Sequence, residues 1–257
     1  MNQKPNDGFL IVASKTKSFY ISAKFLAESI KDYMPDAKVC LVVDEDLIDD
    51  HNHMFDHMIF TERQDDYRAK LWGMSKSPFD RTLYLDADME CCHEDVEGVF
   101  ELLGDHDMMF TEIKDIQRPI FKTSVFPAGK FTYNGGVCLY NSSRSRVIDF
   151  MYRWWELYCL QKNDLWWPTD PDTGKWAEKR YGDRHDMKWW DQFTLWYLLN
   201  EDPQWNDMSV GIIPEGERYN EYSLFWANMR NEKGAVFRHY SRGLSKDNPA
   251  MYTINGQ

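Results

Sequence analysis

Two aspartates separated by one small residue are the strongest chemical signal in the chain. Asp86 and Asp88 directly follow the apolar run 82–85. Side chains on a strand alternate between faces, so residues two apart are expected to point the same way. Two carboxylates aimed at one spot repel each other unless a cation lies between them, and hard divalent ions prefer oxygen ligands and also hold phosphates. The pattern predicts a divalent cation site at a strand end, where open α/β sheets bind ligands.

Two later segments could complete such a site. His239 offers an imidazole as a third ligand, while Gly243 leaves room beside a diphosphate and Lys246 could neutralise it. Asn134 precedes two glycines; its amide could bind a sugar hydroxyl, and the glycines let a ligand approach the backbone. Plainer interpretations remain open, because a strand-end histidine and an Asn-Gly turn need no ligand.

The surrounding pattern predicts the elements that must position these residues. Apolar runs separated by segments of helical periodicity favour a mostly parallel sheet flanked by helices. Strands are expected over 9–13, 39–43, 58–60, 82–85, 108–111, 137–140, 208–213 and 235–240. Helices are expected from Lys17 to before Pro35 and over 67–74, 96–103, 146–160 and 189–199. By strand order, the loop after the first strand, 13–20, is where a nucleotide base would lie.

Composition bounds the classes of function. The chain has 257 residues, which suits one large α/β domain, and a net charge of −12 at pH 7, which disfavours nucleic-acid backbones and anionic membranes. Five cysteines without a C-x-x-C pair favour small buried hydrophobes and a reducing compartment. The first residues lack a signal-peptide pattern, and the run Phe9–Ala13 is too short to span a membrane. We therefore expect a cytoplasmic protein without a membrane span.

These segments, taken in order, resemble the GT-A glycosyltransferases of family 8, the glycogenin and galactinol synthase type. The resemblance is carried by the runs 13–20, 70–72, 81–89, 131–141, 189–193 and 239–246 and so covers nearly the whole chain. It implies an α/β fold of GT-A type, with a Rossmann-like mostly parallel sheet flanked by helices and a smaller C-terminal acceptor-side portion. The expected organisation is one domain over 1–257, with a nucleotide-binding half at about 8–111 and an acceptor-side half at about 112–257.

The resemblance also implies roles for individual residues. Asp86, Asp88 and His239 would hold Mn²⁺ or Mg²⁺, and one imidazole ligand favours manganese. The aromatic ring of Tyr20 would pack on the base, unless Tyr20 is simply a core contact of the first helix. Asp191 would stabilise positive charge on the sugar, unless it merely complements the dipole of its helix. Residues implied to bind the nucleotide are Ala13, Ser14, Thr16, Tyr20, Asp86, Ala87, Gly243 and Lys246. Residues implied to lie near the transferred sugar are Lys70, Asn134, Asp191 and Gln192.

The implied reaction is metal-dependent transfer of a sugar from a nucleotide-diphosphate sugar, a UDP-sugar in the family, with retention of configuration. Eight of the 11 tryptophans lie between Trp154 and Trp196, which predicts the acceptor side there, although Trp154, Trp155 and Trp196 could be helix core. A carbohydrate, glycoconjugate, protein or modified nucleobase acceptor stays open, as does a homodimer. Two alternatives remain: a haloacid-dehalogenase-like phosphatase, which also places Asp-x-Asp after a strand, and a non-catalytic carbohydrate-binding protein.

Overall fold

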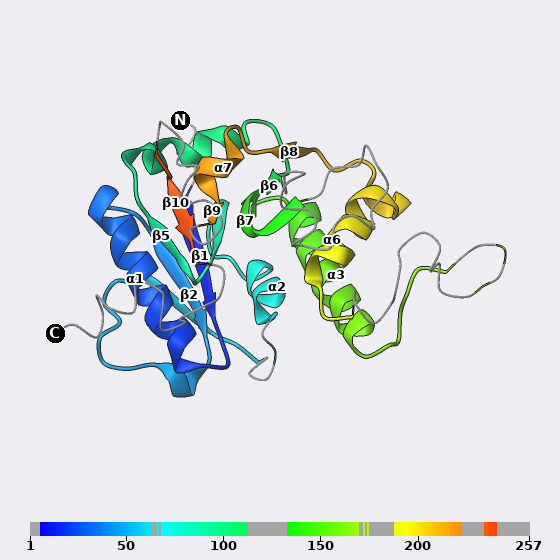
Figure 1. Cartoon of the computed structure of the whole chain (residues 1–257), viewed down its shortest axis with the longest axis horizontal. Helices are drawn as coiled ribbons and strands as arrows, with labels where there is room; N and C mark the ends of the chain where they lie inside the picture. The colour runs from blue at the N-terminus through cyan, green and yellow to red at the C-terminus, as the bar shows by residue number, and fades with distance from the viewer. Residues whose placement is uncertain are drawn as a thin grey trace.

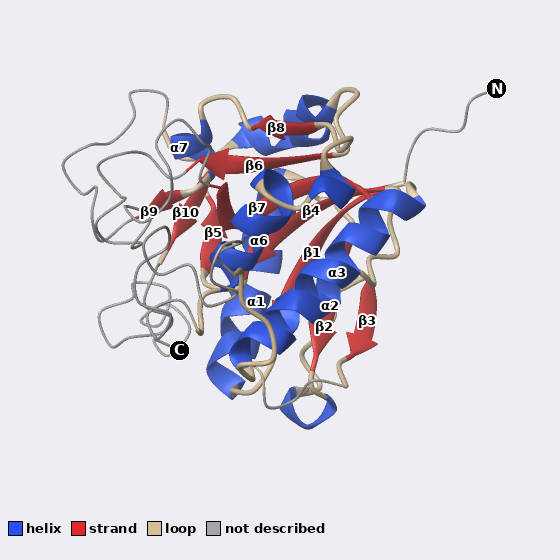
Figure 2. Cartoon of the chain, turned by 90° about the vertical axis from the view of Figure 1, so that its right-hand side faces the viewer, coloured by secondary structure: helices blue, strands red, loops and turns tan. Residues whose placement is uncertain are grey.

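A seven-stranded mixed sheet forms the centre of the molecule. The computed structural model describes residues 6–62, 66, 68–112, 133–169, 172, 174, 188–222 and 234–240. The strands lie in the order β3-β2-β1-β4-β7-β6-β8, with β3 at one edge and β8 at the other (Figure 2). Their bounds are β1 Asp7–Ala13, β2 Val39–Val43, β3 His57–Phe60, β4 Arg81–Asp86, β6 Met108–Glu112, β7 Tyr133–Asn141 and β8 Val210–Ile212. All neighbouring pairs are parallel except β4–β7 and β6–β7.

Helices cover both faces of this sheet. The α-helices are α1 Lys17–Tyr33, α2 Ala69–Met74, α3 Ser145–Lys162, α6 Asp191–Asn200 and α7 Gly216–Tyr219, and the 3₁₀ helices are η1 Glu45–Leu47, η2 Glu94–Leu103 and η5 Pro203–Trp205. Figure 1 shows α1 on one side of the sheet and α2, α3 and α6 on the other. One buried cluster joins the sheet to α1 and η2, and a second joins it to α2, α3 and α6. The central strands β1, β2 and β4 are therefore buried on both faces, which explains their apolar runs, whereas the edge strand β3 is mostly exposed.

The alternation within β4 sets the direction of its chemical end. Leu83 and Leu85 belong to the cluster under α1, whereas Tyr84 belongs to the cluster under α2 and α3. Asp86 continues the Tyr84 side, and the Tyr84 hydroxyl donates a hydrogen bond to Asp86 Oδ1. The end of β4 thus presents its carboxylate toward α2.

The expected strands and helices are found where the periodicity placed them, and the expected α/β fold class is confirmed. Two details differ. The helix expected over 96–103 is a 3₁₀ helix that begins earlier, at Glu94. The helix expected from 189 begins at Asp191, so that Trp189 precedes it with an indole that is 55% exposed.

A second, three-stranded sheet was not expected. It has the order β5-β10-β9, with β5 Met89–Cys91, β9 Glu221–Tyr222 and β10 Phe237–His239. β5 begins directly after Asp88 and pairs antiparallel with β10, in a register that sets His239 opposite Met89. The Tyr240 N–H donates to the Asp88 carbonyl at 2.8 Å, which extends the pairing by one bond. This small sheet brings the histidine beside the aspartates.

None of the helices in the described part of the chain is both long and apolar enough to cross a membrane.

Candidate functional site

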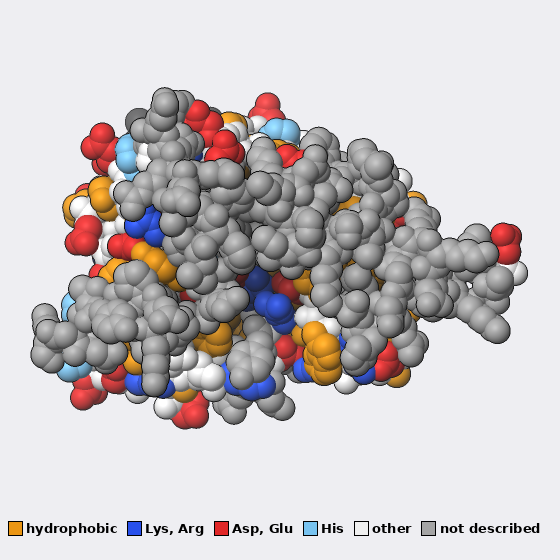
Figure 3. All heavy atoms as spheres, viewed as in Figure 1, with side chains coloured by type: hydrophobic (Ala, Val, Ile, Leu, Met, Phe, Trp, Pro, Cys, Tyr) orange, Lys and Arg blue, Asp and Glu red, His pale blue; other side chains and the backbone are white. Residues whose placement is uncertain are grey.

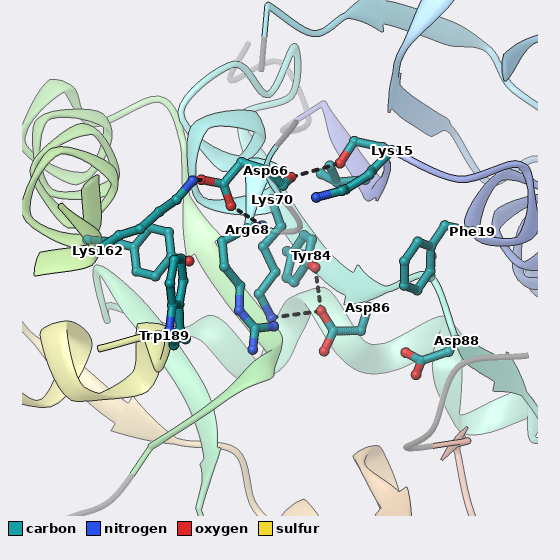
Figure 4. Close-up of a pocket in the computed structure, with 14 residues that line it drawn as sticks. Lys15, Phe19, Asp66, Arg68, Lys70, Tyr84, Asp86, Asp88, Lys162 and Trp189 are labelled. Atoms are coloured by element: carbon teal, nitrogen blue, oxygen red, sulfur yellow. Dashed lines mark hydrogen bonds and ion pairs between the residues drawn. The ribbon is translucent and has the colours of Figure 1, made fainter. Parts of the chain in front are cut away.

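A cavity of about 730 Å³ opens at the carboxyl ends of β1 and β4, the place where parallel sheets bind ligands. It is lined by Val12, Ser14, Lys15, Phe19, Asp66, Arg68, Lys70, Tyr84, Asp86, Ala87, Asp88, Tyr158, Lys162 and Trp189. Figure 4 shows Arg68, Lys70 and Asp86 pointing toward one another, with Phe19 on one side and Trp189 on the other. In Figure 3 one group of basic side chains is visible near the centre of the face viewed, and other basic and acidic side chains are scattered around its margin. The cavity is thus locally rich in cations within an acidic protein.

Asp86, Asp88 and His239 converge at the edge of this cavity. Each offers one ligand atom, and these three atoms lie within 4.8 Å of one another. His239 Nε2 is 3.2 Å from Asp88 Oδ1 and 3.9 Å from Asp86 Oδ2. The expected reason for the convergence was wrong, because β4 ends at Asp86 and Asp88 lies in a turn rather than on the same strand. The turn and the pairing of β5 with β10, not strand alternation, bring the three groups together.

The space among these groups fits a small cation. A Cβ atom at Gly136 would lie only 2.9 Å from Asp86 Oδ2 and 3.2 Å from His239 Cε1, so the glycine keeps the cluster open. Two carboxylates and an imidazole form a donor set that suits Mn²⁺ and accepts Mg²⁺ less readily. The residues present therefore fit the divalent ion that the sequence pattern predicted.

The charges in the cluster support each other. Burial raises the pKa of Asp88, but the charges and hydrogen bonds around it, those of the facing His239 imidazole first among them, together lower it by more, so that the pKa falls below 3.8. Burial lowers the pKa of His239, but the carboxylates of Asp88 and Asp86 together raise it by more, so that the pKa lies above 6.5. The Asp88 carboxylate is held ionised, which is the form that binds a cation.

A row of side chains with alternating charge crosses the cavity floor. Lys70 Nζ lies 2.9 Å from Asp86 Oδ1 and 3.6 Å from Asp191 Oδ2, and it also donates to the Gly135 carbonyl. Arg68 Nε lies 3.2 Å from Asp191 Oδ1. The carboxylates of Asp86 and Asp191 outweigh burial and raise the pKa of Lys70, and Asp191 does the same for Arg68. Arg68 was not singled out from the sequence; its spacing of two residues from Lys70 was the available signal.

Asp191 is buried, at 2% exposed, and is the more deeply buried of the two acids that contact Lys70. Its Oδ2 atom has no hydrogen-bond partner among the described residues, although it faces Lys70. Gly135 lies beside it: a Cβ atom at that position would make only an ordinary contact, 3.8 Å from Asp191 Oδ2. A carboxylate oxygen placed in this way is suited to accept a hydrogen bond from a hydroxyl group.

The loop after β1 supplies the opposite wall, but with a different aromatic residue from the one expected. Tyr20 is fully buried and donates from its hydroxyl to Asp49 Oδ1, so it is a core contact of α1. Phe19 lines the cavity instead, because neighbouring helical residues point about 100° apart. Of the other expected residues, Ser14 lines the cavity, whereas Ala13 is buried in the core and Thr16 lies at the start of α1.

The remaining expected site residues have varied positions. Ala87 lines the cavity. Asn134 is buried within β7 rather than in an Asn-Gly turn, and its Oδ1 accepts from the Gly136 N–H at 2.8 Å, where the register between β6 and β7 is irregular beside the cluster. Gln192 Oε1 accepts from the Trp190 indole at 2.8 Å and is not part of the cavity lining. Gly243 and Lys246 lie outside the described residues.

The tryptophans divide into two groups. Trp154, Trp155 and Trp196 are buried, which confirms them as helix core. Trp189 is exposed at the cavity wall, beside Tyr158 and Lys162 from the C-terminal end of α3. The part of the cavity away from the cation cluster therefore has an aromatic wall.

Comparison with solved structures agrees with this architecture. The galactosyltransferase LgtC, solved with donor and acceptor sugar analogues, superposes with a TM-score of 0.55 at 16% identity, covering 91% of this chain and 86% of that one. An active-site mutant of LgtC gives 0.57 at 15% identity, with 97% and 95% covered. The chain shares the GT-A fold. GlyE, a glycosyltransferase of Streptococcus pneumoniae TIGR4, gives 0.58 at 16% identity and covers 95% of this chain but 56% of GlyE.

Sequence comparison adds no assignment: no family model matches the chain, and no curated protein does. Because the structural relatives are so distant in sequence, what they establish for this chain is its fold. The chemistry of the site has to be argued from its own residues.

Proposed function

We propose that the chain is a metal-dependent glycosyltransferase that moves a sugar from a nucleotide-diphosphate sugar to an acceptor. The observation that carries the proposal is the cluster of Asp86, Asp88 and His239 at the edge of a cation-lined cavity in a GT-A fold. A bound divalent cation would supply positive charge to both phosphates of the leaving diphosphate. Negative charge develops on the diphosphate as it leaves. Electrostatic stabilisation of such developing charge is the largest catalytic contribution in many enzymes.

The chain's own residues account for the rest of the work. Lys70 and Arg68 bring two fixed positive charges to the cavity floor, where they would attract and orient the diphosphate. Asp191 Oδ2 lies beside Gly135, placed to bind a sugar hydroxyl or to stabilise positive charge at the anomeric carbon. Phe19 offers an aromatic face in the loop after β1, where a base would stack. Gly243 and Lys246 remain predicted contacts of the diphosphate.

The finer assignments rest on the family resemblance. It favours a UDP-sugar donor and retention of configuration, and the single imidazole favours Mn²⁺ over Mg²⁺. The cavity draws residues from both predicted halves, since Tyr158, Lys162 and Trp189 come from the second half and all other lining residues come from the first. We assign the acceptor to the side of Trp189, whose exposed indole suits the apolar face of a sugar ring.

We also propose a cellular compartment for the protein. All five cysteines are free thiols, in line with the reducing, cytoplasmic compartment that we propose.

A thermal-shift panel of nucleotide sugars with and without Mn²⁺ tests the function. A ligand that binds only the folded state raises the melting temperature, so UDP with Mn²⁺ should stabilise the wild type. Asp88→Ala should lose this shift. Asp36→Ala is the matched control, because Asp36 is exposed in the loop before β2, at the amino ends of the parallel strands and so away from the cavity at their carboxyl ends. No shift with any nucleotide diphosphate would refute the proposal.

The two alternatives predict other results. A haloacid-dehalogenase-like phosphatase would release phosphate from a generic aryl phosphate and lose that activity in Asp86→Asn. A carbohydrate-binding protein would respond to sugars and ignore UDP. Slow hydrolysis of one UDP-sugar without acceptor would identify the donor.

A further inference from the structure

Asn220 connects the candidate cation site to the body of the protein. It lies between α7 and β9 and is 5% exposed. Its Oδ1 atom is 2.8 Å from His239 Nδ1, and its Nδ2 atom donates to Thr111 Oγ1 at 3.1 Å. Thr111 belongs to β6 in the large sheet and His239 to β10 in the small one. One buried amide therefore spans both sheets and ends on the ring nitrogen that faces away from the carboxylates.

The chemistry of imidazole gives this contact a specific consequence. A neutral histidine carries one ring proton, and only the nitrogen without it can bind a cation. His239 Nε2 faces Asp88, so cation binding requires the proton to be on Nδ1. An amide oxygen can only accept a hydrogen bond, so Asn220 Oδ1 favours a proton on Nδ1. The reversed amide would donate to Nδ1 and favour the tautomer that cannot bind.

We propose that Asn220 is a positioning residue that holds His239 in the Nδ1–H tautomer and so presents the Nε2 lone pair to the cation. The inference rests on the proposed function, in which Asp86, Asp88 and His239 hold that cation. Partners of this kind behind a metal-binding histidine fix its orientation, and their loss weakens metal affinity by about 10- to 100-fold.

The tautomer can be read in the wild-type protein without any metal. Long-range ¹⁵N–¹H spectra of the imidazoles, recorded at a pH above the end of the His239 titration, distinguish Nδ1–H from Nε2–H. The His239→Gln variant assigns the signal among the seven histidines. Nδ1–H is the expected form. A neutral ring protonated on Nε2 overturns the proposal.

Binding of Mn²⁺ alone, followed by electron paramagnetic resonance, gives the second readout. Asn220→Leu removes the acceptor and should weaken binding by about 10- to 100-fold. Asn220→Asp keeps an acceptor in the same place and should bind at least as tightly as the wild type. Asn206→Leu is the matched control, since Asn206 is exposed beside η5 and should leave the affinity unchanged.

The outcomes separate the two proposals. If the wild type does not bind Mn²⁺, or if Asp88→Ala binds it equally well, the cation site of the proposed function fails. If it does show such binding but Asn220→Leu binds like the wild type, only the role of Asn220 fails. If Asn220→Leu does not fold, Asn220→Asp and the tautomer decide, and weaker binding by Asn220→Asp overturns the proposal.

Discussion

Replacing Lys70 by methionine tests the row of alternating charges at the cavity floor. Methionine keeps the apolar stem and removes the charge. The Lys70 side chain is 10% exposed and lies 2.9 Å from Asp86 Oδ1 and 3.6 Å from Asp191 Oδ2. At an effective dielectric constant of about 20, the shorter pair alone attracts by about 6 kcal/mol before desolvation is counted. Removing one partner of a buried pair typically costs about 3–5 kcal/mol, and we expect the lower end because Asp86 is partly exposed.

The assay is urea unfolding of the cation-free protein, with the thermal midpoint as a second measure. A loss of about 3 kcal/mol corresponds to a fall of roughly 6–12 °C for a chain of this size. Lys24→Met is the matched control: its pair with Asp49 is more exposed, so the loss should stay below about 1 kcal/mol. Mn²⁺ should raise the midpoint more in Lys70→Met than in the wild type, because a cation would compensate Asp86. Equal stability of Lys70→Met and the wild type would refute the reasoning.

Three further outcomes are expected. Gly136→Ala should weaken Mn²⁺ binding, measured by calorimetry, and cost about 1–3 kcal/mol of stability, because the added methyl group enters the space between the ligands. Gly98→Ala is the control: its methyl group would meet no atom within 4 Å, so the Mn²⁺ affinity should stay unchanged. Phe19→Ala should weaken UDP binding by about 1–3 kcal/mol, and Tyr20→Phe should not; equal titrations would exclude stacking on Phe19. Burial raises the pKa of Asp49, but its hydrogen bonds lower that pKa by more, from 3.8 to about 2. The ionised Asp49 therefore stabilises the folded protein above the unfolded pKa, and this contribution is lost as the pH falls through about 2. The gap in melting temperature between wild type and Asp49→Asn should therefore be open at pH 7 and close near pH 2; a gap independent of pH would contradict this.

Much of the large sheet was predictable because its strands are buried on both faces. The runs that became β1, β2 and β4 are continuous and apolar, and such runs are legible without knowing their neighbours. The spacing of apolar residues along the first helix would also have placed Tyr20 correctly. It stands in line with Ala23, Ala27 and Ile30 at helical spacing, and all four are fully buried, so the phase of α1 already assigned it to the core.

The small sheet was not predictable from local pattern. β5 has three residues and β9 has two, which is too short for an alternation to stand out. Both strands are stabilised by pairing with β10, which lies more than 130 positions after β5 along the chain. No local sequence preference encodes a pairing over that distance. Asn220 was missed for the same reason: its role depends on two contacts that only the fold creates.

The wrong premise about Asp88 and the missed strand β5 have one physical cause. Had β4 continued through Asp88, both carboxylates would have faced α2 and Lys70, with no backbone free to pair with β10. Because the chain turns at Ala87 and Asp88, β5 leaves in a new direction and its first residue pairs with His239. The Asp88 carbonyl accepts from Tyr240 while its carboxylate faces the imidazole, so the ligand geometry is tied to the hydrogen bonds of the small sheet. Any substitution that breaks the pairing of β5 with β10 should therefore weaken cation binding without touching a ligand.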